Sequence, residues 1–402
     1  MGKTFADPVR TASTALADAE RILSTVPDEP DTSRVVRIGT GSVYIDRLSD
    51  LRERSWQIVH DGRTGAPFRR HVGALMHLCL DDFLIGRWVE GAELAEEGLS
   101  LCRQHGFPFF AWYFLYNSAV FAAGRGQFDE AISLAQEMSA WAVPRGVRAA
   151  ELWAHHPLAL GALGQGDFEE AFRQANAISP AGTLASHVPH ALWLQLDLVE
   201  AAVHTGRFVE AQAHVAAMQA ANVAAISPRM VRIHHACAAL AANDERTPAL
   251  MEAALSVAGA DRWRYDEARV RLAYGEWLRR SKDTVPARAQ LVVAKDLFEG
   301  MDAHPWVERC ATELRAAGER VQRIRQSDDT ALTAQEREIA LLAATGLTNK
   351  DIAERLYLSP RTVSTHLYRI FPKLGITSRA ALRDALDALP TTPASSSLEA
   401  SD

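Results

Sequence analysis

The chain has 402 residues, of which 48% are hydrophobic, and it carries a mild formal net charge of −7. This length predicts two or three domains, and the apolar content is ample for large buried cores, which excludes a disordered protein. The charge is uneven, because residues 332–383 hold eight Lys/Arg against four acidic residues, a charge of +4, and the rest carries −11. A basic module on an acidic body indicates that one end meets a polyanion.

The cysteines and the apolar stretches bear on the cellular compartment. The four cysteines are far apart and include no Cys-x-x-Cys pair, so no disulfide framework is expected and a reducing cytosol is favoured. No basic-then-apolar signal peptide opens the chain, and the most apolar stretch, 107–116, has about half the roughly 20 residues that a bilayer span needs. We therefore expect a cytoplasmic protein without a membrane partner.

A repeat of 40 residues runs through the first part of the chain. Its mark is a glycine followed two residues later by an aromatic residue, at Gly86, Gly126, Gly166 and Gly206. Such a glycine ends a helix in the left-handed conformation, the ring is expected to pack into the bend, and an amphipathic helix follows. Weaker echoes without the glycine fall near 246–248 and 286–288, and almost no stretch alternates apolar with polar residues. The pattern predicts an all-α superhelix of stacked helices.

This part resembles tetratricopeptide-type repeats, although its period exceeds the roughly 34 residues usual in them. The resemblance implies a groove that takes peptides, partner proteins or small effectors. The nine tryptophans are too dispersed along the repeats to indicate a ligand pocket, so the nature of an effector stays open.

The segment after residue 330 carries three helix starts. A Thr-x-x-acid pattern stands at 333–336 and again at 348–351, and a serine followed by proline stands at 359–360. In such caps a side-chain oxygen satisfies a backbone N–H that the first helical turn leaves without a partner. We expect helices at about 334–345, at about 349–356 and from 360 to about 371. Two helices joined by a three-residue turn form a helix-turn-helix, whose second helix can lie in the major groove of DNA.

The helix from residue 360 has an apolar face and a polar face. The apolar face should belong to a core made of Val363, Leu367, Ile370, Ile339, Leu342, Ile352, Ala353 and Leu356. The opposite face carries Arg361, Ser364, Thr365, Tyr368 and Arg369. The major groove is about 12 Å wide and accepts one helix, so this polar and basic face is expected to contact DNA.

The same segment resembles the LuxR-type helix-turn-helix, which is also found in many response regulators. The matching residues are Leu-Thr-x-x-Glu at 332–336, Gly-Leu-Thr-Asn-Lys at 346–350, Arg-Thr-Val at 361–363, His-Leu at 366–367 and Lys-Leu-Gly at 373–375. The resemblance implies that the bases are faced by Ser364, Thr365 and Tyr368, to which we add Arg361. It implies phosphate contact or positioning of the helix by Lys350, Thr362, His366 and Lys373, to which we add Thr348 and Arg369. It also implies that a final helix from about Ser378, with Leu382, Leu386 and Leu389, supports a homodimer.

Two residues depart from the pattern of that family. Pro372 interrupts a helix that usually continues, and because proline lacks a backbone donor we expect a kink or an early end near Ile370. Such an end would put the role of Lys373 in question. Ser364 replaces what is often a lysine in the family, so weaker or different base contacts are expected.

A wider resemblance covers the rest of the chain. Residues 291–320 are similar to the segment before the DNA-binding end of the large ATP-binding regulators of the LuxR type, and the repeats are similar to their helical middle. Those proteins carry an N-terminal P-loop ATPase. Gly2-Lys3-Thr4 echoes only the end of such a loop, and helical repeat follows almost at once, so no nucleotide or other cofactor is expected. The chain would then be a fragment of a longer regulator or a short member of the family.

Catalytic and metal-binding patterns are weak. Histidines pair at 155–156, at 187 with 190 and at 234–235, but no third ligand stands at a suggestive spacing. No Gly-x-Ser-x-Gly elbow occurs, no Cys/His pair is identifiable, and the glycine-rich stretch 39–42 has no strand before it. We expect core or surface histidines, no metal site and no enzyme.

These patterns together predict an all-α protein with a tetratricopeptide-like superhelix followed by a small C-terminal helix-turn-helix domain. The expected boundaries are 1–322 for the repeat domain, 323–330 for a linker, 331–390 for the DNA-binding domain and 391–402 for a disordered tail. The expected function is a dimeric transcription regulator that binds double-stranded DNA and senses an effector or a partner through the repeats. The alternative is a protein-interaction scaffold of tetratricopeptide type with weak or auxiliary DNA binding. An ATP-driven switch ranks third, because it requires residues that the chain does not show.

Overall fold

The computed structural model describes residues 2–318, 332–356, 358–376 and 378–387. The chain divides into two compact units, Met1–Arg320 and Val321–Asp402. Every regular element in the described residues is helical and none is a strand, which confirms the all-α prediction. Over the same ranges, no helix combines the length and the apolar character that crossing a membrane requires. The predicted linker at 323–330 and the predicted tail at 391–402 lie outside the described residues.

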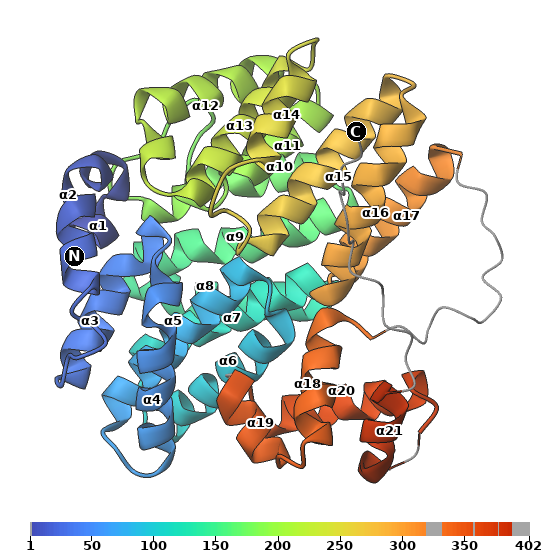
Figure 1. Cartoon of the computed structure of the whole chain (residues 1–402). Coiled ribbons are helices and arrows are strands. Elements are labelled where there is room, and N and C mark those ends of the chain that lie inside the picture. The colour runs from blue at the N-terminus through green and yellow to red at the C-terminus, as the bar shows by residue number, and fades with distance from the viewer. Residues whose placement is uncertain (1, 319–331, 357, 377, 388–402) are drawn as a thin grey trace, which may run out of the picture. The chain divides into compact units, whose positions relative to one another are not determined.

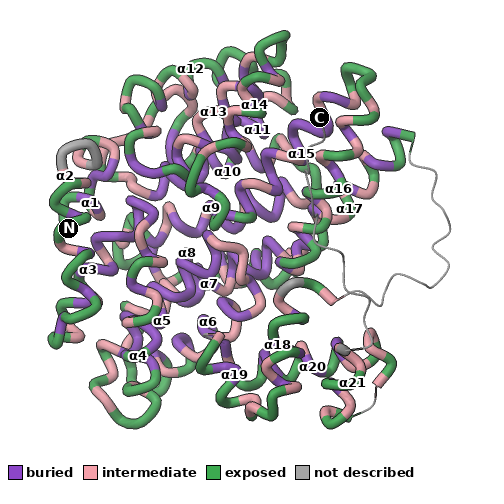
Figure 2. The backbone as a smooth tube through the Cα atoms, in the orientation of Figure 1, coloured by how far each residue is buried: buried purple, intermediate pink, exposed green. Residues whose placement is uncertain are grey.

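The N-terminal unit is a continuous stack of helices, in which each helix from α4 to α17 packs against the next (Figure 1). In chain order its elements are α1 (Gly2–Ala6), α2 (Pro8–Leu23), α3 (Thr32–Ser42), η1 (Val43–Ile45), η2 (Leu48–Leu51), α4 (Arg52–Arg63), α5 (Phe68–Ile85), α6 (Trp88–Gln104), α7 (Pro108–Arg125), α8 (Phe128–Ala142), η3 (Val143–Arg145), α9 (Arg148–Gln165), α10 (Phe168–Ile178), η4 (Pro189–Leu192), α11 (Gln195–His204), α12 (Phe208–Ala220), η5 (Val223–Ala225), α13 (Pro228–Ala242), α14 (Thr247–Leu255), α15 (Arg264–Arg280), α16 (Thr284–Gly300) and α17 (His304–Ala316). Buried residues follow the sides on which successive helices meet (Figure 2).

The 40-residue repeat corresponds to helix pairs joined at the four glycines. Gly86, Gly126, Gly166 and Gly206 have φ values of +82°, +86°, +75° and +76°, a region that side-chain-bearing residues rarely adopt. In each case the next helix begins two residues later, at the aromatic residue, which gives α6, α8, α10 and α12. The predicted helix ends are therefore confirmed.

The aromatic residues after these glycines do not all pack into the bend. Trp88 is fully buried, whereas Phe128 and Phe168 are half-buried and Phe208 is 40% exposed, so the expectation is wrong for Phe208. The difference depends on later parts of the chain, because the ring of Tyr265 lies 4.8 Å from the ring of Trp88 and covers it. The repeat pattern alone does not predict which aromatic residues are buried by contacts with later helices.

The last helices of this unit pack back on the first pairs. α15 contacts α5, and α17 contacts α7 and α9. The rings of Trp306 and Trp88 lie 6.5 Å apart, and Arg125 donates a hydrogen bond to Asp302 at 2.7 Å. The sides of α5, α7 and α9 that meet these helices are therefore occupied by the chain itself.

Gly2-Lys3-Thr4, weighed as the end of a nucleotide loop, and the glycine-rich stretch 39–42 both belong to ordinary helices. Gly2-Lys3-Thr4 opens α1, and the buried Thr4 hydroxyl donates to the carbonyl oxygen of Gly41 in α3 at 2.6 Å. The stretch 39–42 forms the end of α3. The two segments therefore form the contact between α1 and α3.

Two of the paired histidines are buried in a hydrogen-bonded cluster. His156 Nδ1 lies 3.0 Å from His190 Nε2, and the Tyr116 hydroxyl lies 2.7 and 3.2 Å from the same two nitrogens. Burial lowers the pKa of His156 to about 3 and holds the pKa of His190 well below its ordinary value, so both rings are neutral near pH 7. Among the described residues, no group of three or more His, Cys, Asp or Glu side chains is placed to hold a metal ion.

The C-terminal unit is a small helical domain with a core of its own. Its elements are α18 (Ala334–Ala344), α19 (Asn349–Leu356), α20 (Pro360–Lys373), η6 (Arg379–Ala381) and α21 (Leu382–Asp387). All eight predicted core residues lie in this core, six of them buried and Leu342 and Leu356 half-buried. The predicted bounds of α18 and α19 and the predicted start of α20 agree with the structure to within a residue, whereas α20 ends later than predicted and the α-helix expected from about Ser378 begins at Leu382, after η6.

Candidate nucleic-acid interface

Side-chain caps fix where the three main helices of the C-terminal unit begin. The Thr333 hydroxyl accepts a hydrogen bond from the Glu336 amide at 3.2 Å, and the Glu336 carboxylate accepts one from the Thr333 amide at 2.9 Å. The same reciprocal pattern opens α19 at 348–351. At the start of α20, Ser359 Oγ accepts from the Thr362 amide at 3.0 Å. The predicted caps are confirmed, and they set the turn between α19 and α20.

The expected early end of α20 near Ile370 is wrong. The helix continues through Pro372 to Lys373, and the Leu374 amide donates to the Ile370 carbonyl at 3.0 Å. It ends at Lys373, and two residues later Gly375 has φ +67° and its amide donates to the Pro372 carbonyl at 3.1 Å. Proline therefore stands in the last turn of the helix, where its missing N–H removes one helical hydrogen bond.

One face of α20 is exposed and lacks negative charge. Its exposed residues are Arg361, Ser364, Thr365, Tyr368 and Arg369, and Tyr368 is 81% exposed. The helix contains no acidic residue. The hydroxyls of Ser364 and Thr365 each donate to a carbonyl one turn earlier at 3.0 Å, which leaves their oxygens able to accept. This face offers guanidinium donors, hydroxyl acceptors and a phenol ring on one rigid helix.

The residues predicted to contact phosphate or to position the helix divide into two groups. Thr348, Lys350 and Arg369 are exposed, and the Lys350 side chain is 78% exposed with its nitrogen 4.0 Å from Glu354. Thr362 is 1% exposed, and His366 is half-buried. The second group therefore lies against the core of the unit, whereas the first faces outward.

Lys373 belongs with the residues that contact the unit itself. Its ammonium donates to both oxygens of the Glu336 carboxylate, at 2.9 and 2.8 Å, and its side chain is 23% exposed. Burial by itself raises the pKa of Glu336, but the hydrogen bonds from Lys373 and from the Thr333 amide outweigh it and lower that pKa below its usual range. Lys373 therefore ties the end of α20 to the start of α18.

Two arginines that sequence reasoning counted only as charges hold the last segment of the unit. Arg379 donates to Asn349 Oδ1 at 2.5 Å and to the carbonyl oxygen of Leu347. Arg383 donates at 3.2 Å to the carbonyl of Ala344, the last residue of α18. Cations stabilise the carbonyls that a helix C-terminus leaves unpaired. The partners of Asn349 and Ala344 lie 30 and 39 residues away, so no spacing rule signals them.

Asn349 also reaches the exposed face of α20. Its side-chain amide donates to the Ser364 hydroxyl at 2.8 Å, so the residue that departs from the family pattern is held from α19. Arg379, Asn349 and Ser364 form a continuous chain of hydrogen bonds from η6 to α20. Sequence reasoning missed this connection because it assigned Asn349 no role.

The residues implied in dimerisation are placed in part. Leu382 is fully buried in the core of its own unit, and Leu386 packs against that core. Leu389 lies outside the described residues. Leu382 thus serves the fold of the unit.

Comparisons with known proteins concern a part of the chain. Residues 330–385 match the family described as bacterial regulatory proteins, luxR family. A putative HTH-type transcriptional regulator of Mycobacterium tuberculosis is 47% identical over 77 residues, which are 19% of this chain and 8% of that protein. The transcriptional regulatory protein LiaR of Bacillus subtilis is 40% identical over 72 residues, 17% of this chain and 34% of that protein. The DNA-binding transcriptional activator DevR/DosR of M. tuberculosis is 35% identical over 107 residues, 24% of this chain and 49% of that protein.

The chain thus spans less than half the length of each of these relatives. The matched family segment coincides with the unit built from α18 to α21, in which the capped helix pair α19–α20 presents its exposed, acid-free face. The C-terminal unit is a helix-turn-helix domain of the luxR family of bacterial regulatory proteins.

Proposed function

We propose that the protein is a sequence-specific DNA-binding transcription regulator whose helix α20 enters the major groove. The observation that carries this proposal is the two-sided character of α20. Val363, Leu367 and Ile370 are buried on one side, and the opposite side is exposed and has no acidic residue. The match to the luxR family and the transcriptional regulators among the relatives support the same function.

The exposed face suggests a division of roles along α20. Arg361, Ser364, Thr365 and Tyr368 contact base edges in this proposal, since they lie on the face opposite the core. The exposed Thr348, Lys350 and Arg369 contact the phosphate backbone. Thr362, His366 and Lys373, which lie against the unit itself, position the helix.

The remaining parts of the proposal concern assembly and regulation. Two copies bind as a homodimer to two half-sites, as is usual for helix-turn-helix proteins. The N-terminal unit senses an effector or a partner, and the protein works in the cytoplasm. The stacked helices of that unit, with a surface pocket between α8, α9 and α10, support a sensing role.

Duplex binding at several salt concentrations, with base substitutions in the site, tests the proposal. Log affinity should fall against log salt by about 0.9 per phosphate contacted. Thr365→Ala or Tyr368→Ala should weaken the preference at particular base pairs by about 1–3 kcal/mol. Binding that ignores both salt and sequence would count against the proposal.

The Asn349–Ser364 hydrogen bond favours a second candidate, a protein-interaction scaffold with weak or auxiliary DNA binding. A hydroxyl already held within the unit offers less to a base than the lysine usual in the family. Recovery of one stoichiometric protein partner, with no DNA retained by the purified chain, would support this scaffold and contradict the regulator.

A further inference from the structure

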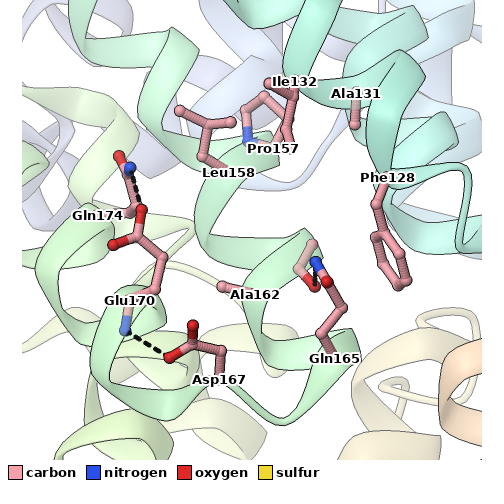
Figure 3. A pocket seen from close by; sticks show the side chains of 11 residues that line it. Phe128, Ala131, Ile132, Pro157, Leu158, Ala162, Gln165, Asp167, Glu170 and Gln174 are labelled. Atoms are coloured by element: carbon pink, nitrogen blue, oxygen red, sulfur yellow. Dashed lines mark hydrogen bonds between the residues drawn. The ribbon is translucent and has the colours of Figure 1, made fainter.

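A pocket of about 270 Å³ lies in the N-terminal unit between α8, α9 and α10 (Figure 3). Its apolar wall includes Phe128 and Ile132 from α8 and Pro157 and Leu158 from α9. Ile132 is 41% exposed, so the pocket reaches the surface.

The 40-residue repeat shows which side chain is missing here. Position 161 in α9 corresponds to Phe121 in α7, and Ala131 in α8 corresponds to Gly91 in α6. The Phe121 ring fills the space between α6 and α7, because a Cβ at Gly91 would lie 2.3 Å from its Cζ. Position 161 is a glycine, and Gly161 and Ala131 both line the pocket. The pocket therefore stands where the preceding repeat holds a phenyl ring.

The fold does not require the glycine at position 161. A Cβ there would lie 3.5 Å from Phe128 Cδ1 and 3.8 Å from Ala123 Cβ, which is ordinary contact. A Cβ at Gly124 in α7, in contrast, would lie 2.4 Å from the Trp88 ring. Glycine in the middle of a helix is destabilising relative to alanine. Gly161 thus keeps the pocket open at a cost to α9 that no close packing contact explains.

The polar end of the pocket is acidic. It is formed by Asp167 and Glu170 near the start of α10, and no lysine or arginine lines the pocket. Arg173 donates to both oxygens of Glu170, at 2.7 and 2.6 Å, which compensates that charge. Asp167 accepts from the Glu170 amide at 3.1 Å and has no arginine or lysine partner in the described residues. A cation is therefore favoured at this end, and an anion is disfavoured.

We propose that this pocket binds a small molecule with an aromatic ring that is neutral or positively charged. The ring of the bound molecule occupies the place in this repeat that is equivalent to the place of the Phe121 ring between α6 and α7 in the preceding repeat. A cavity of about 150 Å³ lined by apolar side chains is enough to bind benzene, so this pocket accepts a ring with a short substituent. An amino group on that substituent lies toward Asp167. That this molecule is the effector of the regulator rests on the proposed function, whereas its binding to the pocket does not.

The test uses the full chain and three probes of one shape, which are indole, tryptamine and indole-3-acetate. Isothermal titration should detect saturable binding of indole and tryptamine, with tryptamine tighter by up to about fivefold, the range of a partly exposed ion pair. Indole-3-acetate should bind most weakly. Asp167→Asn keeps an N-capping side chain and should abolish the advantage of tryptamine over indole.

The decisive variant is Gly161→Phe, which places a ring in the pocket and should weaken all three probes by about tenfold or more. Gly161→Leu serves the same purpose if the phenylalanine variant does not fold by circular dichroism. The matched control is Gly300→Ala at the end of α16, where a Cβ meets nothing within 4 Å and binding should not change. Unchanged binding in the filled variant, or no saturable binding of any probe to the wild-type chain, would overturn the proposal.

DNA binding is measured separately on the same samples. Probe binding that disappears in Gly161→Phe, in a chain that recognises no DNA sequence, would refute the proposed function and leave the pocket established. Sequence-specific DNA binding without probe binding would refute the pocket alone.

Discussion

Lys350 and Lys373, which were both predicted to contact phosphate or to position the helix, should behave differently when each is replaced by alanine. Lys373 donates to both Glu336 oxygens, with side chains 23% and 7% exposed, whereas Lys350 is 78% exposed and 4.0 Å from Glu354. Hydrogen bonds to charged groups contribute about 1.5–3 kcal/mol, and partial exposure of Lys373 reduces this. We expect Lys373→Ala to destabilise the C-terminal unit by about 1–2 kcal/mol.

Hydrogen exchange of the full chain, followed by mass spectrometry, measures this effect on α18 and α20. A loss of about 1–2 kcal/mol corresponds to exchange about 5 to 30 times faster in peptides from these helices. The contribution depends on pH because the folded pKa of Glu336 is lowered. It is fully present above the unfolded value of about 4.3 and is lost as pH falls through the lower folded value, so wild type and variant should converge in acid.

Lys350→Ala is the matched control. It should leave exchange within about 0.5 kcal/mol of wild type, lower the affinity for all DNA sequences alike and reduce the salt slope by about 0.9. The reasoning is refuted if Lys373→Ala leaves exchange unchanged while reducing the salt slope, since Lys373 would then be a phosphate contact.

Three further predictions concern stability. Pro372→Ala restores an N–H toward the Tyr368 carbonyl and should slow exchange in the last turn of α20 by about 1 kcal/mol; faster exchange would mean that proline stabilises this end. Gly375→Ala should cost about 1–2 kcal/mol, because its φ of +67° is strained for alanine, and unfolding in denaturant should show a lower midpoint; an unchanged midpoint would disprove the strain. His156 and His190 are buried and neutral with folded pKa values below the ordinary 6.5, so stability is present above about pH 6.5 and is lost as pH falls. The loss should approach about 1.4 kcal/mol per pH unit for each histidine, and equal unfolding free energies at pH 5 and pH 7 would contradict it.

Local backbone requirements could be predicted from the sequence. Gly86 and its three equivalents end helices because their φ values are positive, and Thr333 and Ser359 begin helices because their oxygens accept from the first turn. Each of these signals acts within about four residues, so the spacing of residue types is sufficient to find it.

Contacts between distant segments could not be predicted in this way. Trp88 and Phe208 occupy the same place in the repeat, yet one is buried and the other is 40% exposed, because Tyr265 covers Trp88. Lys373 donates to Glu336, which lies 37 residues earlier in the chain. Because of this ion pair, the charge of Lys373 stabilises the C-terminal unit instead of facing outward as that of Lys350 does. The end of α20 was predicted wrongly because Pro372 was weighed without the Gly375 amide that closes the same turn.

The candidate site shows the same division. The exposed face of α20 followed from helical spacing, since Tyr368 lies opposite the buried Leu367 and Ile370 side of the helix. The chain of hydrogen bonds from Arg379 through Asn349 to Ser364 joins three elements, and only their three-dimensional arrangement reveals it.

Selection of duplexes from a random DNA pool by the purified full chain, at about 0.15 M salt, tests the DNA-reading role most directly. We predict enrichment of one motif with two half-sites about one helical turn, or a multiple of it, apart. Repeating the selection with Tyr368→Ala should relax the motif at defined positions in each half-site. A wild-type chain that enriches no motif would contradict sequence-specific binding through α20.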